Sequence, residues 1–487
     1  MKSHMRNKAV FTGVIFLFLS AVIFFIILYS NLIGIWKDLR RFSKMDYEGA
    51  FFSMYDISCY REEDFAAYRG VLTVKAEQPV ERWSVLSRYL DRIFSSKNTV
   101  TNVFLGLDPV VLWEKSQHKE EKWVKNLDQY LISYITARQG VSFDILLPTY
   151  PLSNWTELSA SQLEENLDSY SRLIEDLGGY SNVHIYFLGG EQWLIANPAN
   201  YLERGQTNED VSRKIFFYTF CDQEYQITPA NSSVLFERLT SQVEQERESP
   251  TVYPDLSDWC IFFFGDSVFD YLSGSLSIPG VVNGLTGART YNLGYSGASA
   301  TEDPMAVLSF NYMVNHFLEL NTGGVDKNSN YYRGLVDYIE EDHEDKKCFF
   351  VIEFGLNDYF GGRTVENPLD GYDVGTYAGA LRTGVKTLQD AYPEAEILLL
   401  APTYAEVFSG GTEINGVNGG VLTDYVDAAL RVAEEMGVHC LNNYADSGIN
   451  ADSQARYLTD GVHPNEAGSF LLGNCILEYI GSISSEN

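Results

Sequence analysis

Residues 261–267 read Ile-Phe-Phe-Phe-Gly-Asp-Ser, and this stretch decides how the C-terminal half of the chain folds. Four consecutive apolar residues predict a buried strand, and the Gly-Asp-Ser that follows predicts a turn at its end. Two more strands are predicted at 348–354 (CFFVIEF) and 396–402 (EILLLAP), and a helix over 423–436. Short strands that alternate with longer helices are typical of a parallel sheet with crossover helices. A serine at the carboxyl end of such a strand lies where open α/β sheets place reactive groups.

The same alternation occurs in the N-terminal half, so the sequence predicts two α/β units with parallel sheets. The first covers residues 45–227 and the second residues 258–487. Residues 228–257 are polar and include the charged stretch VEQERESP, which favours a linker made of a connecting helix and a loop. The chain has 487 residues, of which 45% are hydrophobic and 21% charged, so it is long enough for two or three packed domains.

The segment from Ala9 to Ile35 is almost wholly apolar and predicts a membrane anchor. As a helix it would extend about 40 Å, against roughly 30 Å for the hydrocarbon core of a bilayer. It is longer than the apolar part of a secretory signal and has no small-residue cleavage site. An uncleaved transmembrane helix is therefore favoured over a removed signal, and a buried core helix is the alternative.

Basic residues stand on both sides of this segment, so the positive-inside rule gives no clear orientation. They are Lys2, Arg6 and Lys8 before it, and Lys37, Arg40, Arg41 and Lys44 after it. We expect residues 1–44 to form a cytoplasmic stub and a single-pass anchor in the cell membrane, with the remainder outside the cytoplasm. This expectation rests on economy of targeting and on the substrate class argued below.

The composition excludes some classes of partner and site. A formal net charge of −31 argues against nucleic acid, which selects basic surfaces, and an acidic surface that keeps the protein soluble explains the charge. The six cysteines contain no C-x-x-C pair, which argues against a zinc or redox motif. Cys260, Cys348 and Cys440 lie at the edges of apolar runs, so we favour free thiols, with disulfides as the alternative.

Three further segments contain residue types that catalysis by a serine requires. The segment 292–299 (NLGYSGAS) is rich in small residues, which let backbone N–H groups face an oxyanion. Asn357, in the turn GLND after a strand, has a side-chain amide that can donate to the same oxyanion. In the turn DGVHP, the carboxylate of Asp460 stands three residues before His463 and can orient its imidazole. Each segment alone is more often an ordinary turn; together, with a helix predicted after Pro464, they favour a catalytic site.

These four segments, in this order, resemble the blocks of the SGNH (GDSL-type) hydrolase superfamily, and the resemblance covers residues 258–483. It implies a flavodoxin-like three-layer α/β/α domain with serine-esterase activity and no metal or organic cofactor. It also implies the roles of five residues: Ser267 as nucleophile, Asp460 and His463 as its triad partners, and Ser267, Gly297 and Asn357 as the oxyanion hole. Gly-Asp-Ser-Val stands here for the family's Gly-Asp-Ser-Leu, a hydrophobic exchange.

The two halves of the chain also resemble each other, which predicts that the N-terminal unit is a degenerate, non-catalytic copy of the same fold. The collinear pairs are 103–109 with 351–358, 142–152 with 395–407, 182–184 with 437–439, and 201–212 with 457–469. The last pair needs one gap at Pro464. Chance similarity between strand-rich segments is the alternative.

In this alignment the chemistry is missing from the N-terminal copy. Arg204 takes the position of Asp460, and Thr207 that of the histidine. Asp108 replaces the oxyanion asparagine, and a carboxylate would repel an oxyanion. The counterpart of Gly-Asp-Ser is assigned to residues 55–58 (YDIS). Without a base, a serine hydroxyl is a poor nucleophile at neutral pH.

The sequence therefore predicts a serine esterase that hydrolyses O-acyl esters, chiefly O-acetyl, on cell-surface or other polysaccharide. An O-acyltransferase of envelope polysaccharide and a lipid esterase remain as alternatives, because both would use the same triad. A non-enzymatic glycan-binding scaffold is less favoured, since all four blocks are intact. The sequence does not determine the acyl group, the glycan or the oligomeric state.

Overall fold

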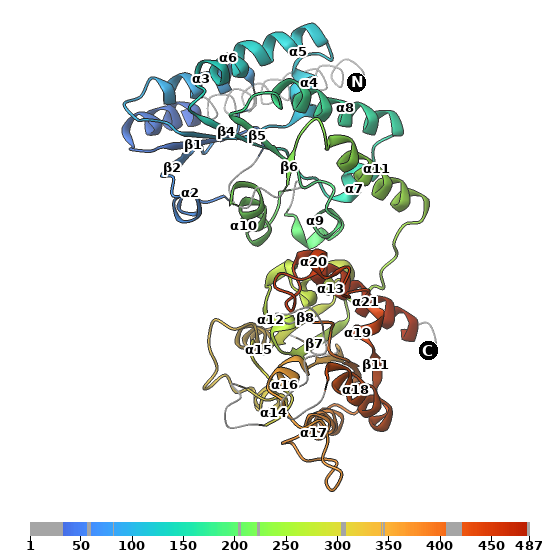
Figure 1. Cartoon of the computed structure of the whole chain (residues 1–487). Helices are drawn as coiled ribbons and strands as arrows, with labels where there is room; N and C mark the ends of the chain where they lie inside the picture. Colours follow the sequence, from blue (N-terminus) through green and yellow to red (C-terminus); the bar gives the residue numbers. More distant parts are fainter. Residues whose placement is uncertain are drawn as a thin grey trace, which may run out of the picture. The chain divides into compact units, whose positions relative to one another are not determined.

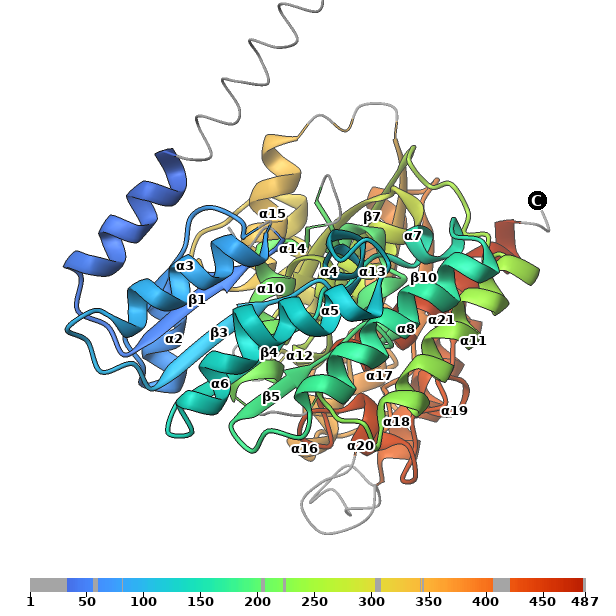
Figure 2. The same ribbon diagram turned by 90° about the horizontal axis from the view of Figure 1, so that it is seen from above.

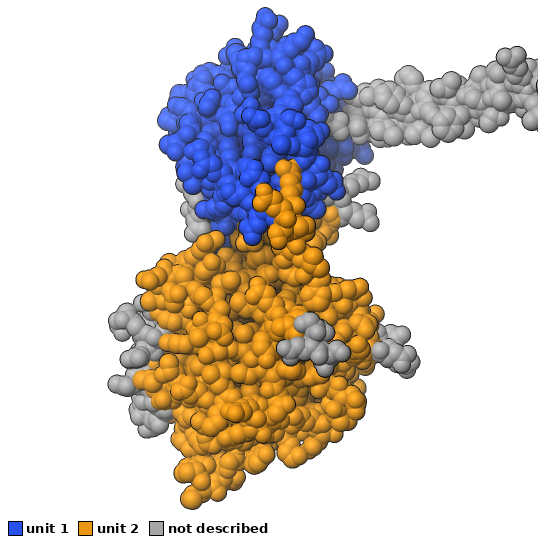
Figure 3. Space-filling model, turned by 90° about the vertical axis from the view of Figure 1, so that its right-hand side faces the viewer, with its two compact units in different colours: residues 1–191, 212–245 blue, residues 192–211, 246–487 orange. Residues whose placement is uncertain are grey.

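The computed structural model describes residues 33–55, 60–80, 82–202, 206–221, 225–302, 308–341, 343, 346–405 and 421–484. The chain divides into two compact units, coloured separately in Figure 3. Unit 1 comprises Met1–Glu191 and Ser212–Gln245, and unit 2 comprises Gln192–Val211 and Glu246–Asn487. A short segment from the N-terminal half, Gln192–Val211, thus belongs to unit 2. The domain boundaries predicted from the sequence, at residues 227 and 258, keep this segment in the N-terminal domain. They stay predictions.

Unit 2 contains a five-stranded parallel sheet in the order β11-β10-β9-β7-β8. Its strands are β7 (Trp259–Gly265), β8 (Arg289–Gly294), β9 (Lys347–Glu353), β10 (Glu396–Leu400) and β11 (His439–Leu441). Counted along the chain this is the order 2-1-3-4-5, so the connections run to opposite sides of β7. Open parallel sheets bind ligands at the carboxyl ends of their strands beside such a switch point.

Helices of unit 2 pack in two groups, α13 with α21, and α14 with α17 and α18, on opposite faces of the sheet (Figure 1). The longer helices are α13 (Ile278–Thr286), α14 (Phe310–Leu318), α15 (Asn330–Glu340), α17 (Tyr377–Ala391), α18 (Leu422–Met436) and α21 (Glu466–Ser484). The shorter ones are α9 (Gln192–Ile195), α12 (Ser267–Asp270), α16 (Leu356–Phe360), α19 (Asn443–Asp446) and α20 (Gln454–Tyr457), with 3₁₀ turns η2 (Pro198–Asn200) and η5 (Gly274–Leu276).

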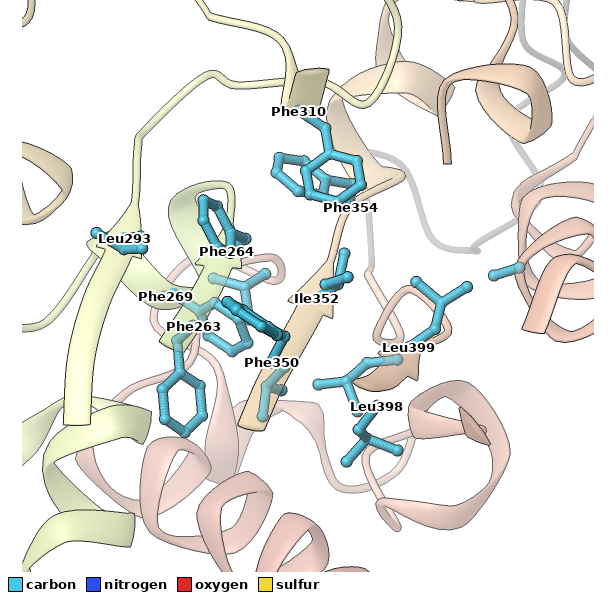
Figure 4. Close-up of a cluster of buried hydrophobic side chains, with 14 of the residues drawn as sticks. Phe263, Phe264, Phe269, Leu293, Phe310, Phe350, Ile352, Phe354, Leu398 and Leu399 are labelled. Atoms are coloured by element: carbon cyan, nitrogen blue, oxygen red, sulfur yellow. The ribbon is translucent and has the colours of Figure 1, made fainter. Parts of the chain in front are cut away.

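Aromatic side chains of the central strands form much of this unit's core (Figure 4). Phe262 of β7 stacks on Phe350 of β9 with ring centroids 5.1 Å apart. Phe263 and Phe264 are also fully buried, although neighbouring residues of a strand point to opposite faces. Helices cover both faces of a parallel sheet, so its central strands are apolar without alternation. This explains why the run Ile-Phe-Phe-Phe predicts the position of β7.

Unit 1 contains a second sheet in the order β2-β1-β3-β4-β5-β6. Its strands are β1 (Gly49–Ser53), β2 (Thr73–Lys75), β3 (Asn102–Gly106), β4 (Ser142–Leu146), β5 (Val183–Tyr186) and β6 (Gln226–Ile227). All pairs are parallel except β5 with β6. The first five strands repeat the 2-1-3-4-5 order of unit 2, so the second sheet is consistent with a related fold.

Helices also lie on both faces of the unit 1 sheet, with α3, α5, α6 and α8 on one face and α2 and α10 on the other (Figures 1 and 2). Their bounds are α2 (Glu62–Arg69), α3 (Trp83–Phe94), α4 (Pro109–Lys115), α5 (Glu120–Leu127), α6 (Ser133–Ala137), α7 (Leu152–Thr156), α8 (Ala160–Leu177), α10 (Glu209–Phe216) and α11 (Ser232–Glu248). The stretch predicted as a linker, 228–257, is therefore largely the helix α11.

The structure confirms an α/β protein with two sheets in which parallel pairs predominate. The predicted strands at 348–354 and 396–402 are β9 and β10, and the predicted helix over 423–436 is α18. The predicted anchor, 9–35, lies outside the described residues except for its last three. Within the described ranges, no helix is long and apolar enough to cross a membrane.

Candidate active site

Ser267 is the first residue of α12, directly after β7, where the sequence predicted a reactive serine. Asp266 caps this short helix, its Oδ1 accepting from the Val268 N–H at 2.9 Å. A Cβ at Gly265 would lie 2.6 Å from the Phe269 ring and 2.9 Å from the Glu353 carbonyl oxygen. Only glycine therefore lets the chain turn so closely from β7 into α12.

Asp460 and His463 lie in a tight turn before α21. The carboxylate Oδ1 of Asp460 accepts from the backbone N–H groups of Val462 and His463, at 3.1 and 2.9 Å. Gly461, inside this turn, has a φ of +82°, which favours glycine. The Thr459 N–H donates to the His463 carbonyl at 2.8 Å and closes the turn. The Asp-x-x-His spacing thus fixes both side chains on one rigid loop.

The structure brings these three predicted residues together. His463 Nδ1 is 2.7 Å from Asp460 Oδ2, and His463 Nε2 is 2.9 Å from Ser267 Oγ. A carboxylate can only accept, so Nδ1 carries the proton and Nε2 accepts from the serine hydroxyl. Burial raises the pKa of Asp460, but hydrogen bonds and the charge of His463 outweigh it, so the pKa is lowered overall. The geometry is that of a base poised to deprotonate a serine.

The predicted oxyanion residues lie in the turn after β8 and in the helix after β9, the two strands that flank β7. Gly297 is exposed, with a φ of +83°, in the turn after β8. Among the described residues, no acceptor contacts the backbone N–H of Gly297 or of Ser267. Asn357, in α16 after β9, donates from Nδ2 to the Ala298 carbonyl at 2.8 Å and to Asp266 Oδ2 at 3.2 Å. Its amide is therefore held next to the Gly297 turn, with both N–H groups engaged.

Residues 263–469 match the model of the GDSL-like Lipase/Acylhydrolase family. The matched range begins in β7 and includes Ser267, Gly297, Asn357 and the turn that carries Asp460 and His463. Residues 263–469 are a GDSL/SGNH hydrolase domain. The resemblance inferred from the four segments is thereby confirmed, and the family is one of esterases and lipases.

Part of the chain is similar to part of a curated bovine protein, the isoamyl acetate-hydrolyzing esterase 1 homolog of Bos taurus. Identity is 26% over 133 residues, which are 26% of this chain and 52% of the relative, so the chain spans about half the length of that relative. A solved structure from Lactobacillus plantarum covers 46% of this chain and 97% of its own, at 20% identity and a TM-score of 0.35. The M. smegmatis aryl esterase covers 46% and 99%, at 18% identity and a TM-score of 0.32.

Three carboxyl groups are buried beneath the site of the GDSL domain: Asp266, Glu353 and Asp358, each fully buried. Burial raises the pKa of Asp266 to about 7, and burial followed by the charge of Asp266 raises the pKa of Glu353 well above its usual range. Burial also raises the pKa of Asp358, which accepts from the Ala300 and Thr301 N–H groups at 2.8 and 3.0 Å.

Two residues at the end of α12 contact the site and escaped the sequence analysis. The ring of Tyr271 stacks on the imidazole of His463, with centroids 4.6 Å apart and planes 11° from parallel. The carboxylate of Asp270 accepts from the backbone N–H and the hydroxyl of Ser296, next to Gly297, at 2.8 and 2.6 Å. Their partners lie in distant segments, and no spacing in the sequence indicates these contacts.

The turn before α10 has the same backbone hydrogen bonds as the catalytic turn before α21. The Leu202 N–H donates to the Gln206 carbonyl at 2.6 Å, as Thr459 does to His463 at 2.8 Å. Asn208 donates to the Asn200 carbonyl at 2.9 Å, as Asn465 does to Tyr457 at 2.9 Å. Isolated bridges join Tyr201 to Thr207 and Leu458 to Pro464. The two turns thus correspond without any gap.

This register corrects the predicted equivalences. Gln206, not Thr207, takes the position of His463, and Thr207 takes that of Pro464. The gap was wrong because it was placed to match a motif, whereas the hydrogen bonds set the register. Arg204, assigned to the position of Asp460, lies outside the described residues; the gapless register shifts that position to the residue before it.

The other two equivalences change for the same reason. Asp108 caps α4 as Gly355 caps α16, so Asp108 corresponds to Gly355. Two residues further on, Val110 takes the position of Asn357. Sheet register places Ser53 opposite Gly106 as Gly265 lies opposite Glu353, so Tyr55 takes the position of Ser267. Residues 56–58 of the assigned YDIS segment lie outside the described residues.

Proposed function

We propose that this chain is a serine esterase that hydrolyses O-acyl esters in its GDSL domain. Ser267 acts as nucleophile, His463 as general base, and Asp460 orients the imidazole. The observation that carries the proposal is the continuous hydrogen-bond chain from Ser267 Oγ through both nitrogens of His463 to Asp460 Oδ2. Nucleophilic catalysis by serine needs a base in contact and a third group that orients the base, and both are present.

The reaction proceeds by two acyl transfers. Ser267 Oγ bonds to the ester carbonyl carbon while its proton passes to His463 Nε2. The imidazolium gives that proton to the leaving alcohol oxygen as the C–O bond breaks, which leaves an acyl-serine. His463 then takes a proton from water, the hydroxide oxygen bonds to the acyl carbon, and the acid leaves with Ser267 reprotonated. Asp460 stabilises the imidazolium in both halves.

The oxyanion of each tetrahedral intermediate would be bound by the N–H groups of Ser267 and Gly297 and by the amide of Asn357. The two backbone groups have no acceptor among the described residues and are ready to donate. The longer bond of Asn357, 3.2 Å to Asp266, is the one that a developing oxyanion would compete for. A donor of this kind contributes about 10²–10³ in rate.

Unit 1 would contribute no second active centre. Tyr55 and Val110 of unit 1 stand where the GDSL domain has Ser267 and Asn357, and Gln206, in the segment that joins unit 2, stands where it has His463. A half-buried tyrosine whose hydroxyl donates to the Leu146 carbonyl at 3.0 Å is no substitute for an activated serine. All hydrolysis by the chain is therefore attributed to one serine.

The substrate we propose is an acetylated polysaccharide at the cell surface. The bovine relative is named for hydrolysis of isoamyl acetate, an acetate ester, which supports an acetyl group. The apolar segment 9–35 supports a single-pass anchor in the cell membrane with the GDSL domain outside the cytoplasm. An acidic chain of net charge −31 agrees with a neutral rather than a polyanionic glycan.

Hydrolysis of p-nitrophenyl acetate by a protein lacking residues 1–35 tests the assignment. Ser267→Ala should lower kcat/KM by at least about 10³-fold, because the nucleophile is lost. Thr207→Ala, a hydroxyl removed at the position of Pro464, should leave the rate unchanged. Equal rates for wild type and Ser267→Ala would contradict the proposal.

Substrate class is tested with a series of p-nitrophenyl esters and with acetylated glycans. We expect acetate to be preferred over long acyl chains, and acetate to be released from acetylated xylan. Preference for long chains would identify a lipid esterase instead. Transfer of the acetyl group to an added acceptor glycan in place of water would identify an O-acyltransferase.

A further inference from the structure

Asp270, the last residue of α12, connects the helix of the nucleophile to the turn that follows β8. Its Oδ2 accepts from the Ser296 N–H at 2.8 Å and from the Ser296 hydroxyl at 2.6 Å. Ser296 directly precedes Gly297, an exposed residue whose backbone N–H has no acceptor among the described residues and is the proposed oxyanion donor. The position of this N–H relative to the nucleophile therefore depends on the Asp270 carboxylate.

The other carboxylate oxygen of Asp270 is hydrogen-bonded to the first residue of α15. Oδ1 accepts from the Asn330 N–H at 3.0 Å. In return, Asn330 Nδ2 donates to the carbonyl oxygens of Asp270 and Leu272, at 3.0 and 3.1 Å. Asn330 is nearly buried, and α15 packs closely on β8, because a Cβ at Gly334 would lie 2.4 Å from the Asn292 carbonyl oxygen. Asp270 is thus held by a rigid element.

A second set of hydrogen bonds, made by Asn292, holds the end of the turn that is joined to β8. It does not include Ser296, which is bonded to Asp270. Asn292 donates from Nδ2 to the Phe269 carbonyl at 2.8 Å and accepts the Gly294 N–H at 3.0 Å. This fixes the end of β8 against α12, but the turn continues for three more residues to Gly297. At Ser296 itself, the hydrogen bonds of the backbone N–H and of the hydroxyl both go to Asp270 Oδ2.

We propose that Asp270 is the positioning residue of the oxyanion hole, a role that rests on the proposed esterase function. It touches no reacting atom, but it sets the distance between the Gly297 N–H and Ser267. Pre-organised donors stabilise the oxyanion because they need no rearrangement during the reaction. A free turn would bind the ground-state ester almost as well and the tetrahedral intermediate less well, so kcat falls while KM is little changed.

Asp270→Ala should lower kcat by about 10–100-fold with KM within about threefold of wild type, a loss below that of deleting a donor outright. Asp270→Asn keeps the shape and one acceptor oxygen, so its loss should be intermediate. Asp255→Ala is the matched control, because Asp255 accepts the Ser257 N–H at 3.0 Å in an exposed turn outside the site. That variant should match wild type.

Binding of phenylboronic acid separates positioning from general structural damage. A boronic acid forms a tetrahedral adduct on Ser267 with an oxygen in the oxyanion hole, so Asp270→Ala should weaken its inhibition constant by the same factor as kcat/KM. Damage to folding alone would lower the melting temperature and the active fraction, but not this constant. Ser296→Ala, which removes only the hydroxyl contact, should show a smaller effect that is absent in the Asp270→Ala background.

Two results overturn the inference. A folded Asp270→Ala or Asp270→Asn protein with wild-type kcat and boronate inhibition would show that the carboxylate does not position the turn. Full hydrolysis by Ser267→Ala would instead overturn the esterase assignment and the inference with it. An inactive Ser267→Ala beside an unaffected Asp270→Ala contradicts the inference alone.

Discussion

Tyr271 covers one face of the proposed catalytic base, and its ring can stabilise the charge that His463 acquires during the reaction. The two rings are nearly parallel, and Tyr271 is 41% exposed, so the contact lies at the rim of the site. A cation over an aromatic face is worth about 0.5–1 kcal/mol at exposed positions. Tyr271→Phe should keep kcat within about twofold, whereas Tyr271→Leu should lower it by about 2–5-fold, measured on p-nitrophenyl acetate.

Another tyrosine provides the control for this prediction. Tyr312 stacks on His316 with centroids 4.0 Å apart and is 37% exposed, but it has no part in the site. Tyr312→Leu should therefore leave kcat unchanged. A Tyr271→Leu protein as active as wild type would show that the stacked ring does not assist the base.

At the scale of single residues, the sequence predicts groups that follow one another along the chain. Ser267 begins the helix that follows β7, and Asp460 and His463 share one turn, so short motifs identify them and the structure brings them into contact. Asp270 and Tyr271 could not be predicted in the same way. Their partners, Ser296 and the imidazole, meet them only after β8 and the last turn have packed around α12.

The strand pair β7 and β9 carries buried carboxyl groups at its carboxyl end, and these should make stability depend on pH. Asp266 follows β7, and Glu353 is the last residue of β9, opposite Gly265. In the unfolded chain such groups lose their protons near pH 4, whereas burial raises the folded pKa of Asp266 to about 7 and raises that of Glu353 well above its usual range. Between the unfolded and the folded pKa values, the folded state therefore binds more protons than the unfolded state. The free energy of unfolding falls as the pH rises through this range.

Glu353→Gln should reduce this pH dependence, because glutamine replaces the protonated carboxyl without a proton to lose. One retained proton changes the free energy of unfolding by about 1.4 kcal/mol per pH unit, or a few degrees in melting temperature for a unit of this size. Melting curves at pH 5 and pH 7.5 measure the difference. Glu319→Gln, on the surface, should keep the wild-type slope, and an equal slope in Glu353→Gln would contradict the prediction.

At the scale of elements, apolar runs predict β7, β9 and β10 well, because strands buried on both faces need no alternation. The register between the two halves of the chain could not be predicted as well. Matching similar residues in the two sequences placed a gap at Pro464. The backbone hydrogen bonds of Leu202 and Asn208 correspond to those of Thr459 and Asn465 without a gap. The two turns share their backbone hydrogen bonds although their side chains differ.

The whole molecule does not divide at one point along the chain, because Gln192–Val211 is part of unit 2. Asn208 donates to the Ser275 hydroxyl and Asn197 to the Ser275 carbonyl, at 2.8 and 3.1 Å. Gly284 leaves room for this segment, since a Cβ there would lie 2.2 Å from Asn197 Oδ1. The turn before α10 thus has Gln206 at the position of His463 and is joined by hydrogen bonds to Ser275 within unit 2.

Asn208 and Asn465 occupy matching positions in the two turns. We expect Asn208 to support stability and Asn465 to support catalysis. Both accept a backbone N–H at 3.0 Å, from Val211 and from Gly468, but only Asn208 also bonds to Ser275. Asn208→Ala should lower stability by about 1–3 kcal/mol, seen as a lower melting temperature, with kcat of the folded protein retained. Asn465→Ala should lower kcat more than tenfold, because it loosens the turn that carries Asp460 and His463. Equal losses of kcat in both variants would show that the N-terminal turn still serves catalysis.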